Sequence, residues 1–208
     1  MASPSDAAVP LPQLSWSRIQ SLLIAILLKL QLDRELHPRP CQPLQGLSLA
    51  TVSFGLLMLV YAAIELVLTI IAGISCQAPS IQALAPPLGA GQWLLATAAL
   101  AIGAFYEECL YRAFLPEISL LILLRVGKKI SDRHRKAILR TTEILCILIF
   151  ALSHRYLGPL AIVNALLCGT ILRICYRKSG GLLCGTAAHF CYNITVLLFS
   201  SLPPMPRG

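Results

Sequence analysis

Long apolar segments recur along this chain, and they limit its fold more than any other feature. Residues 47–74, 92–115, 141–157, 160–176 and 182–202 are each dominated by apolar side chains. A helix needs about 20 apolar residues to cross the hydrocarbon core of a bilayer, where a chain must satisfy its backbone hydrogen bonds internally. Charged residues make up only 12% of the 208 residues, about half of the share found in soluble domains. The sequence therefore predicts an all-α, polytopic transmembrane helix bundle with five spans.

The first 46 residues differ from the rest and are expected to form an N-terminal tail and an amphipathic helix. Arg18 and Lys29 lie on one face of a helix over residues 16–32. The other face carries six apolar side chains: Trp16, Ile19, Leu23, Ile26, Leu27 and Leu30. This pattern favours a helix that lies in the membrane interface, with a spanning helix as the alternative. Residues 47–202 are expected to form the transmembrane helical domain.

The positive charges gather between the apolar segments. Seven Lys and Arg residues lie within residues 125–140, and others lie in residues 33–46 and at Arg173, Arg177 and Lys178. Cytoplasmic loops are rich in Lys and Arg, so loops 33–46, 116–140 and 177–181 are predicted to be cytoplasmic. Loops 75–91 and 157–159 are then exterior, in an integral protein of the plasma (inner) membrane. The net charge of +8 is explained by contact with the lipid bilayer, and no nucleic-acid partner is expected.

Two adjacent carboxylates interrupt the apolar segment 92–115. A charged side chain at the centre of a bilayer costs at least ~3 kcal/mol, so an intramembrane carboxylate suggests a functional site. Glu108 and Arg112 are four residues apart and can form an ion pair on one helical face. Glu107 points about 100° away and is expected to be free for chemistry. A purely structural role for these charges, holding helices in register, is the alternative.

Two further polar clusters lie in later apolar segments. One is His154, and the other combines His189 with Asn193 one helical turn later. A single intramembrane His is commonly an interhelical hydrogen bonder. Together with an unpaired glutamate, however, two His and an Asn complete a hydrolytic set, with a base for water and donors for an oxyanion. Seven of the eight cysteines lie within or beside apolar segments and are expected to be packing residues.

The three clusters occur in a specific order. Glu-Glu-x-x-x-Arg at residues 107–112, Phe-x-x-x-His at 150–154 and His-x-x-x-Asn at 189–193 resemble the motifs of the CPBP family. This family comprises the CAAX proteases and bacteriocin-processing (Abi) enzymes, including type II CAAX prenyl endopeptidases. The resemblance covers about residues 92–199 and implies an intramembrane endopeptidase.

The resemblance also implies a role for each motif residue. Glu107 corresponds to the catalytic glutamate, and Glu108 and Arg112 complete the first motif. His154 would help to hold the attacking water, while His189 and Asn193 would form the oxyanion site. The implied substrate is a membrane-embedded or lipidated peptide or protein.

Other functions remain compatible with the same residues. No cofactor is expected, but Glu107, His154 and His189 could bind zinc in a metal-dependent variant of the protease. A non-catalytic membrane scaffold or immunity-type protein would use the polar clusters for helix association. A small transporter would use the carboxylates as a proton relay, but no internal repeat supports that alternative.

The predicted topology can be tested by cysteine labelling in a Cys76→Ser background, which removes the native thiol of an expected exterior loop. A cysteine introduced at Ser131 should react with an impermeant maleimide only after permeabilisation, because its loop is cytoplasmic. A cysteine introduced at Ser80 is the exterior control and should react in intact cells. Labelling at position 131 in intact cells would show that the orientation is wrong.

Overall fold

The computed structural model describes residues 11, 13–36, 41–74, 87–126 and 131–201, and within these ranges the chain forms helices and no strand. The α-helices are α1 (Trp16–Leu36), α2 (Pro43–Ile74), α3 (Ala90–Glu107), α4 (Leu115–Val126), α5 (Asp132–Ser153), α6 (Pro159–Ser179) and α7 (Leu182–Ser200). A π-helix, η2 (Glu108–Phe114), joins α3 to α4, and a short 3₁₀ helix, η3 (Arg155–Leu157), follows α5. The predicted all-α class is confirmed.

Four helical stretches are long and apolar enough to cross a membrane: Pro43–Ile71, Ala90–Ser119, Pro159–Ser179 and Leu182–Ser200. They correspond to four of the five predicted spans. The fifth, residues 141–157, belongs to α5, which begins nine residues earlier at Asp132 with a charged first half. The apolar part of α5, residues 141–153, is shorter than the about 20 residues that a spanning helix needs. The fifth span therefore stays a prediction.

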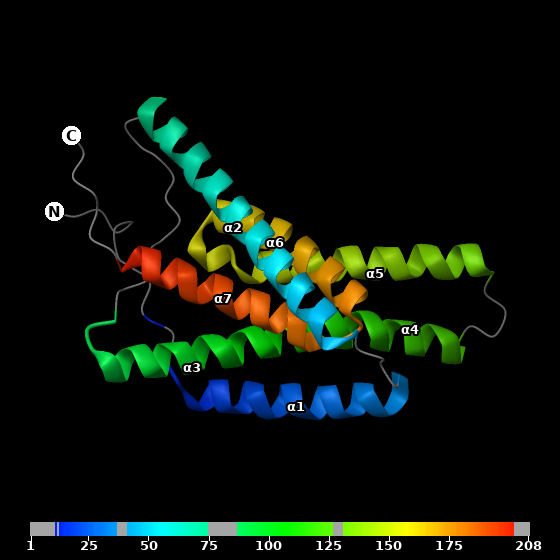
Figure 1. The fold of residues 1–208 in the computed structure, drawn as a ribbon. Helices are drawn as coiled ribbons and strands as arrows, with labels where there is room; N and C mark the ends of the chain where they lie inside the picture. The colour runs from blue at the N-terminus through cyan, green and yellow to red at the C-terminus, as the bar shows by residue number, and fades with distance from the viewer. Residues whose placement is uncertain (1–10, 12, 37–40, 75–86, 127–130, 202–208) are drawn as a thin grey trace.

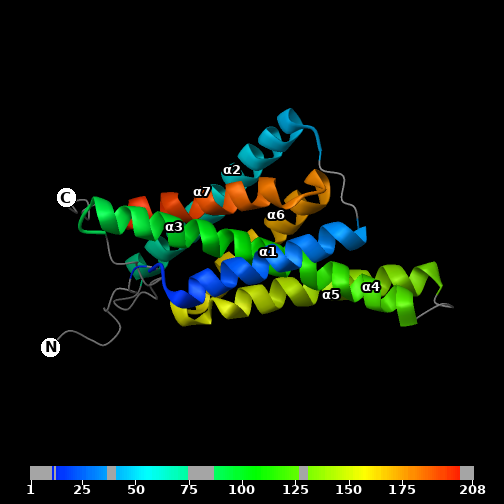
Figure 2. The same cartoon turned by 90° about the horizontal axis from the view of Figure 1, so that it is seen from below.

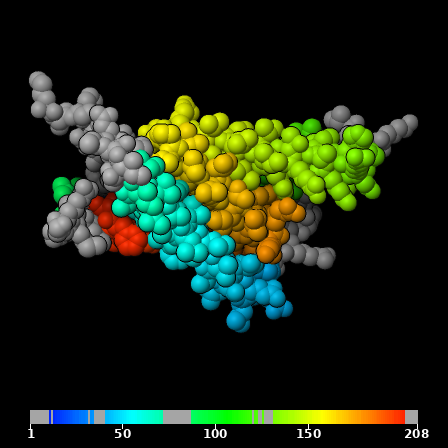
Figure 3. Space-filling view, turned by 90° about the horizontal axis from the view of Figure 1, so that it is seen from above, coloured from blue at the N-terminus to red at the C-terminus, as the bar shows by residue number. Residues whose placement is uncertain are grey.

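The helices pack side by side, with their ends gathered at two ends of the molecule (Figures 1 and 2). α3, η2 and α4 form one continuous rod, with α7 and α1 alongside α3 and α5 alongside α4. α2 crosses α6 and α7 on the face seen in Figure 3. The α6–α7 turn and the C-terminal end of α1 lie towards the end from which α4 and α5 project, as the predicted topology requires (Figure 1).

Small side chains fill the contacts between these helices, and large apolar ones face outward. On α3, for example, Ala96, Ala99, Gly103 and Ala104 are buried, whereas Leu94 is exposed. Small residues let membrane helices approach closely. Large side chains such as Leu and Ile can face the lipid, because lipid tails are as apolar as they are. Cys109, Cys146, Cys168 and Cys175 are buried in the same way, as expected, but Cys191 is exposed.

The N-terminal helix lies against the bundle. α1 packs along α3 and η2, where Ala25 is fully buried and accepts a hydrogen bond from the Cys109 thiol (3.3 Å). Its predicted apolar face points outward, with Leu27 65% exposed. α1 is not among the helices that are long and apolar enough to cross a membrane, so the interfacial and the spanning positions both stay predictions.

The apolar segment predicted over residues 92–115 stops just before Pro116, but in the structure the helix continues through this proline. Proline has no N–H for the carbonyl oxygen of Arg112, four residues earlier. In the structure Arg173 of α6 donates a hydrogen bond to that carbonyl. The preceding π-helix has a wider turn than an α-helix, because the Leu115 N–H donates to the carbonyl of Leu110, five residues earlier instead of four. A side chain from another helix therefore satisfies the backbone group that proline leaves free.

Arg173 is the clearest difference from the expected topology, which placed it at a cytoplasmic turn. Its side chain is only 9% exposed and lies 2.6 Å from Glu143 of α5 and 3.9 Å from Glu117 of α4. A buried cation requires such partners, because an unpaired charge in low dielectric is costly. Arg173 thus ties together α4, α5 and α6.

Replacing Arg173 with alanine should reduce thermal stability in detergent by on the order of 3 kcal/mol, since it takes a close partner from the half-buried Glu143 carboxylate and leaves the Arg112 carbonyl without its donor. Arg177 is a matched control, because it also contacts Glu143 (3.5 Å) but its side chain is 64% exposed. Arg177→Ala should cost less than about 1 kcal/mol. Equal effects of the two variants in a melting assay would contradict a buried anchoring role for Arg173.

Candidate active site

The predicted ion pair between Glu108 and Arg112 is present and buried. The Nε atom of Arg112 lies 3.5 Å from Oε1 of Glu108, and both side chains are 1% exposed. The guanidinium group also stacks on the ring of Phe150 from α5, with its carbon 3.8 Å from the ring centre. Both residues belong to the π-helix η2, and irregular helical turns of this kind are frequent at functional sites.

His189 of α7 lies between the two adjacent carboxylates. Its Nδ1 atom is 3.0 Å from Oε1 of Glu108, and its Nε2 atom is 3.8 Å from Oε2 of Glu107. Glu107 faces away from Arg112, as helical geometry predicts. The side chain beside it is a histidine from another helix, which the spacing within residues 92–115 could not indicate. Glu107 keeps the more open position, with its side chain 27% exposed against 1% for Glu108.

The charges of this cluster can balance. Glu107 and Glu108 carry two negative charges, and Arg112 supplies one positive charge. His189, which lies against both carboxylates, is the residue that could supply the second positive charge. The orientation of His189 is set by Glu108, so its other ring nitrogen is directed at Glu107. The arrangement presents a partly exposed carboxylate beside an oriented imidazole.

His154 caps the C-terminal end of α5 and, like His189, contacts the ring of Phe150. The Phe150 ring makes edge contacts with both imidazoles, with ring centres 4.8 Å from His154 and 6.3 Å from His189. Nδ1 of His154 is 2.9 Å from the carbonyl oxygen of Phe150. A carbonyl can only accept, so Nδ1 is the donor and Nε2 of the neutral ring keeps its lone pair.

Asn193 lies on α7 one turn beyond His189, is partly exposed, and forms no hydrogen bond with any residue that the structure describes. An Asn placed this way can donate its amide N–H groups to a bound molecule. Its neighbour Tyr192 is instead engaged, accepting a hydrogen bond from Asn164 (2.9 Å).

Sequence reasoning missed the residues that shape this cluster from other helices. Phe150 was seen only as a motif position, yet it contacts Arg112 and both histidines. Gly185 of α7 gives room to Glu108, because a Cβ atom there would lie 2.9 Å from Oε2 of that glutamate. The one available signal was spacing: Gly185 precedes His189 by one helical turn and shares its face.

The residues proposed as possible zinc ligands do not form a metal site here. Among the described residues, no group of three or more His, Cys, Asp or Glu side chains is arranged to hold a metal ion. Glu107 and His189 are adjacent, whereas the contacts of His154 are with Ser153 and Phe150. The geometry therefore does not fit a three-ligand zinc centre built from Glu107, His154 and His189.

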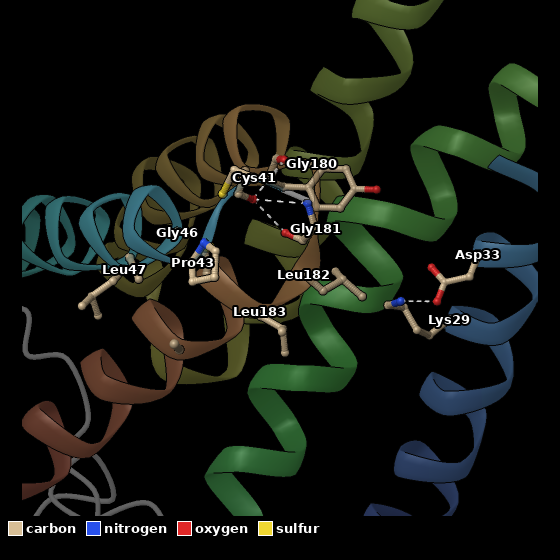
Figure 4. Close-up of a pocket in the computed structure, with 15 residues that line it drawn as sticks. Lys29, Asp33, Cys41, Pro43, Gly46, Leu47, Gly180, Gly181, Leu182 and Leu183 are labelled. Atoms are coloured by element: carbon tan, nitrogen blue, oxygen red, sulfur yellow. Dashed lines mark hydrogen bonds and ion pairs between the residues drawn. The ribbon is translucent and has the colours of Figure 1, made fainter. Parts of the chain in front are cut away.

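A large pocket lies away from these residues, between the C-terminal part of α1 and the N-terminal ends of α2 and α7 (Figure 4). Its volume is about 850 Å³, and its lining is mainly apolar, including Leu47, Leu182 and Leu183. The Lys29–Asp33 ion pair lies on its α1 side. This size is in the range of pockets that bind small molecules.

Comparison with known proteins gives one match. A family model described as type II CAAX prenyl endopeptidase Rce1-like matches residues 89–195, just over half of the chain. No curated protein and no solved structure matches the chain. The matched range includes all six predicted site residues and leaves out α1 and α2.

Gly185→Ala should disturb the cluster, because the new methyl group would push on a carboxylate held by both Arg112 and His189. We expect a loss of about 1–3 kcal/mol in stability, the usual cost of overpacking, and lower activity per folded molecule. Gly55→Ala in α2 is the control, because a Cβ atom there meets no described atom within 4 Å. Melting curves showing no difference between the two variants would contradict the close approach of α7 to Glu108.

Proposed function

The chain belongs to the type II CAAX prenyl endopeptidase Rce1-like family, and we propose that it hydrolyses a peptide bond of a membrane-associated substrate. The proposal rests above all on one observation, the partly exposed Glu107 carboxylate beside a buried and oriented His189. Family membership supplies the reaction class. The position of the cluster, within helices apolar enough to span a membrane, supports cleavage at membrane depth.

Glu107 acts as the base in the proposed reaction. It accepts a proton from water, and the resulting hydroxide adds to the carbonyl carbon of the scissile bond. His189 in its charged form stabilises the ionised Glu107, and Glu108 fixes the ring for this purpose. Glu107 then returns the proton to the leaving nitrogen as the C–N bond breaks, giving a new carboxyl group and a new amine.

His154 and Asn193 take the remaining roles. The free Nε2 lone pair of His154 can accept a hydrogen bond from the attacking water and hold it near the cluster. Asn193 can donate to the oxyanion that forms on the carbonyl oxygen. Because both ring nitrogens of His189 face carboxylates, the oxyanion role falls to Asn193 more than to His189.

A lipid group on the substrate would have a place to bind. The apolar pocket between α1, α2 and α7 includes Leu183 and Ala187, which share one face of α7, whereas Gly185 and His189 lie on another. A lipid anchored there would hold its substrate against α7, the helix that carries His189. We therefore propose a membrane-embedded or lipidated peptide as the substrate class.

The proposed function is tested with a synthetic peptide carrying a prenylated cysteine near its carboxyl end, incubated with the purified protein in liposomes. Glu107→Gln should abolish cleavage, because an amide cannot accept the proton from water. Glu65→Gln in α2 is the control, since it removes another intramembrane carboxylate away from the cluster and should leave cleavage intact. Equal activity of wild type and Glu107→Gln would reject Glu107 as the base.

The same assay separates the alternatives. Activity should survive exhaustive chelation, checked by elemental analysis, because the described residues present no three-ligand metal group. Loss on chelation with recovery on adding zinc would establish the zinc-dependent variant instead. A correctly folded protein that cleaves no membrane peptide would favour the scaffold role.

A further inference from the structure

One cation near the cluster comes from outside the part of the chain that the family model matches. Arg18 of α1 extends its side chain onto α3, where its Nη1 atom lies 2.7 Å from the position that a Cβ atom on Gly103 would occupy. A methyl group at this position would force the end of the Arg18 side chain to shift. The contact therefore depends on a residue pair from α1 and α3.

Gly103 and Glu107 lie on the same face of α3, four residues apart. One helical turn separates them, about 6 Å along the axis. Arg18 is thus held one turn from the proposed base. The guanidinium group of Arg18 and the Glu107 carboxylate therefore belong to neighbouring turns of one face of α3.

Arg18 has no carboxylate within ion-pair distance among the residues that the structure describes. Its side chain is partly buried, where a guanidinium group gains much from a charged hydrogen-bond partner. Arg112 and Arg173 differ in this respect, since each is paired with a glutamate. Arg18 is the cation beside the cluster that is available to an incoming anion.

We infer that Arg18 is a specificity-determining residue, which binds the terminal carboxylate of a substrate cut a few residues from its carboxyl end. This inference rests on the proposed hydrolysis at Glu107. An extended peptide covers at most ~3.5 Å per residue, so one turn of α3 corresponds to about two residues. An Arg–carboxylate pair is planar and bidentate, which suits recognition of a chain end.

The inference is tested with two prenylated peptides that differ only in ending with a carboxylate or a carboxamide. Wild type should cleave the acid with a kcat/KM about 10–100-fold higher than the amide, the range for a charge-assisted hydrogen bond. Arg18→Ala should remove this preference by slowing the acid alone. Arg34→Ala, on the exposed last turn of the same helix, should keep it.

Gly103→Ala provides a second test that keeps the charge but displaces it, because the added methyl group would overlap the Arg18 guanidinium. It should reduce the acid preference while leaving cleavage of the amide near the wild-type rate. If Arg18→Ala slowed both peptides equally, Arg18 would have a general electrostatic or structural role and the inference would be wrong.

Binding measurements separate this inference from the proposed function. In a Glu107→Gln background, which cannot turn over, the acid peptide should still bind more tightly than the amide, and adding Arg18→Ala should equalise the two. Equal binding before that change would overturn the role of Arg18. Failure of wild type to cleave either peptide would reject the hydrolase, while the binding preference alone decides for or against Arg18.

Discussion

The buried ion pair between Glu108 and Arg112 is the interaction on which the candidate active site depends. Two charges removed from water require close partners on every side, and these partners come from different helices. Phe150 of α5 covers the guanidinium group, His189 of α7 binds the carboxylate, and Gly185 leaves space for it. The position of His189 relative to Glu107 follows from these contacts. Because Glu108 contacts both Arg112 and His189, the ion pair also fixes the orientation of the His189 imidazole.

A second buried cation supports the same region from the other side. Arg173 binds the Arg112 carbonyl, which lacks a donor because of Pro116, and it also meets Glu143. The irregular π-helix is therefore held by side chains as well as by its own backbone. The first helix adds to this arrangement although the family model does not include it. Arg18 reaches α3 at Gly103, where an added Cβ atom would lie 2.7 Å from its Nη1 atom.

The fold class and the family were predictable because both depend on local patterns. Apolar length identifies membrane helices, and the spacing of Glu108 and Arg112 predicts their pairing. Contacts between helices were not predictable, since helical geometry places Glu107 away from Arg112 but cannot say that His189 approaches it. Arg173 was misplaced for a related reason, because the positive-inside pattern does not distinguish a loop cation from a buried one. Glu143, an acidic residue inside an apolar segment, was the available signal for its partner.

The central claim is that Glu108 acts on catalysis through His189, and a double-mutant cycle tests it most directly. The measurement is kcat of peptide cleavage for Glu108→Gln, His189→Asn and the double variant, using protein that melts as wild type does. If Glu108 only orients His189, the double variant should be no slower than His189→Asn alone. Losses that multiply would show that the two residues act independently and would contradict the account.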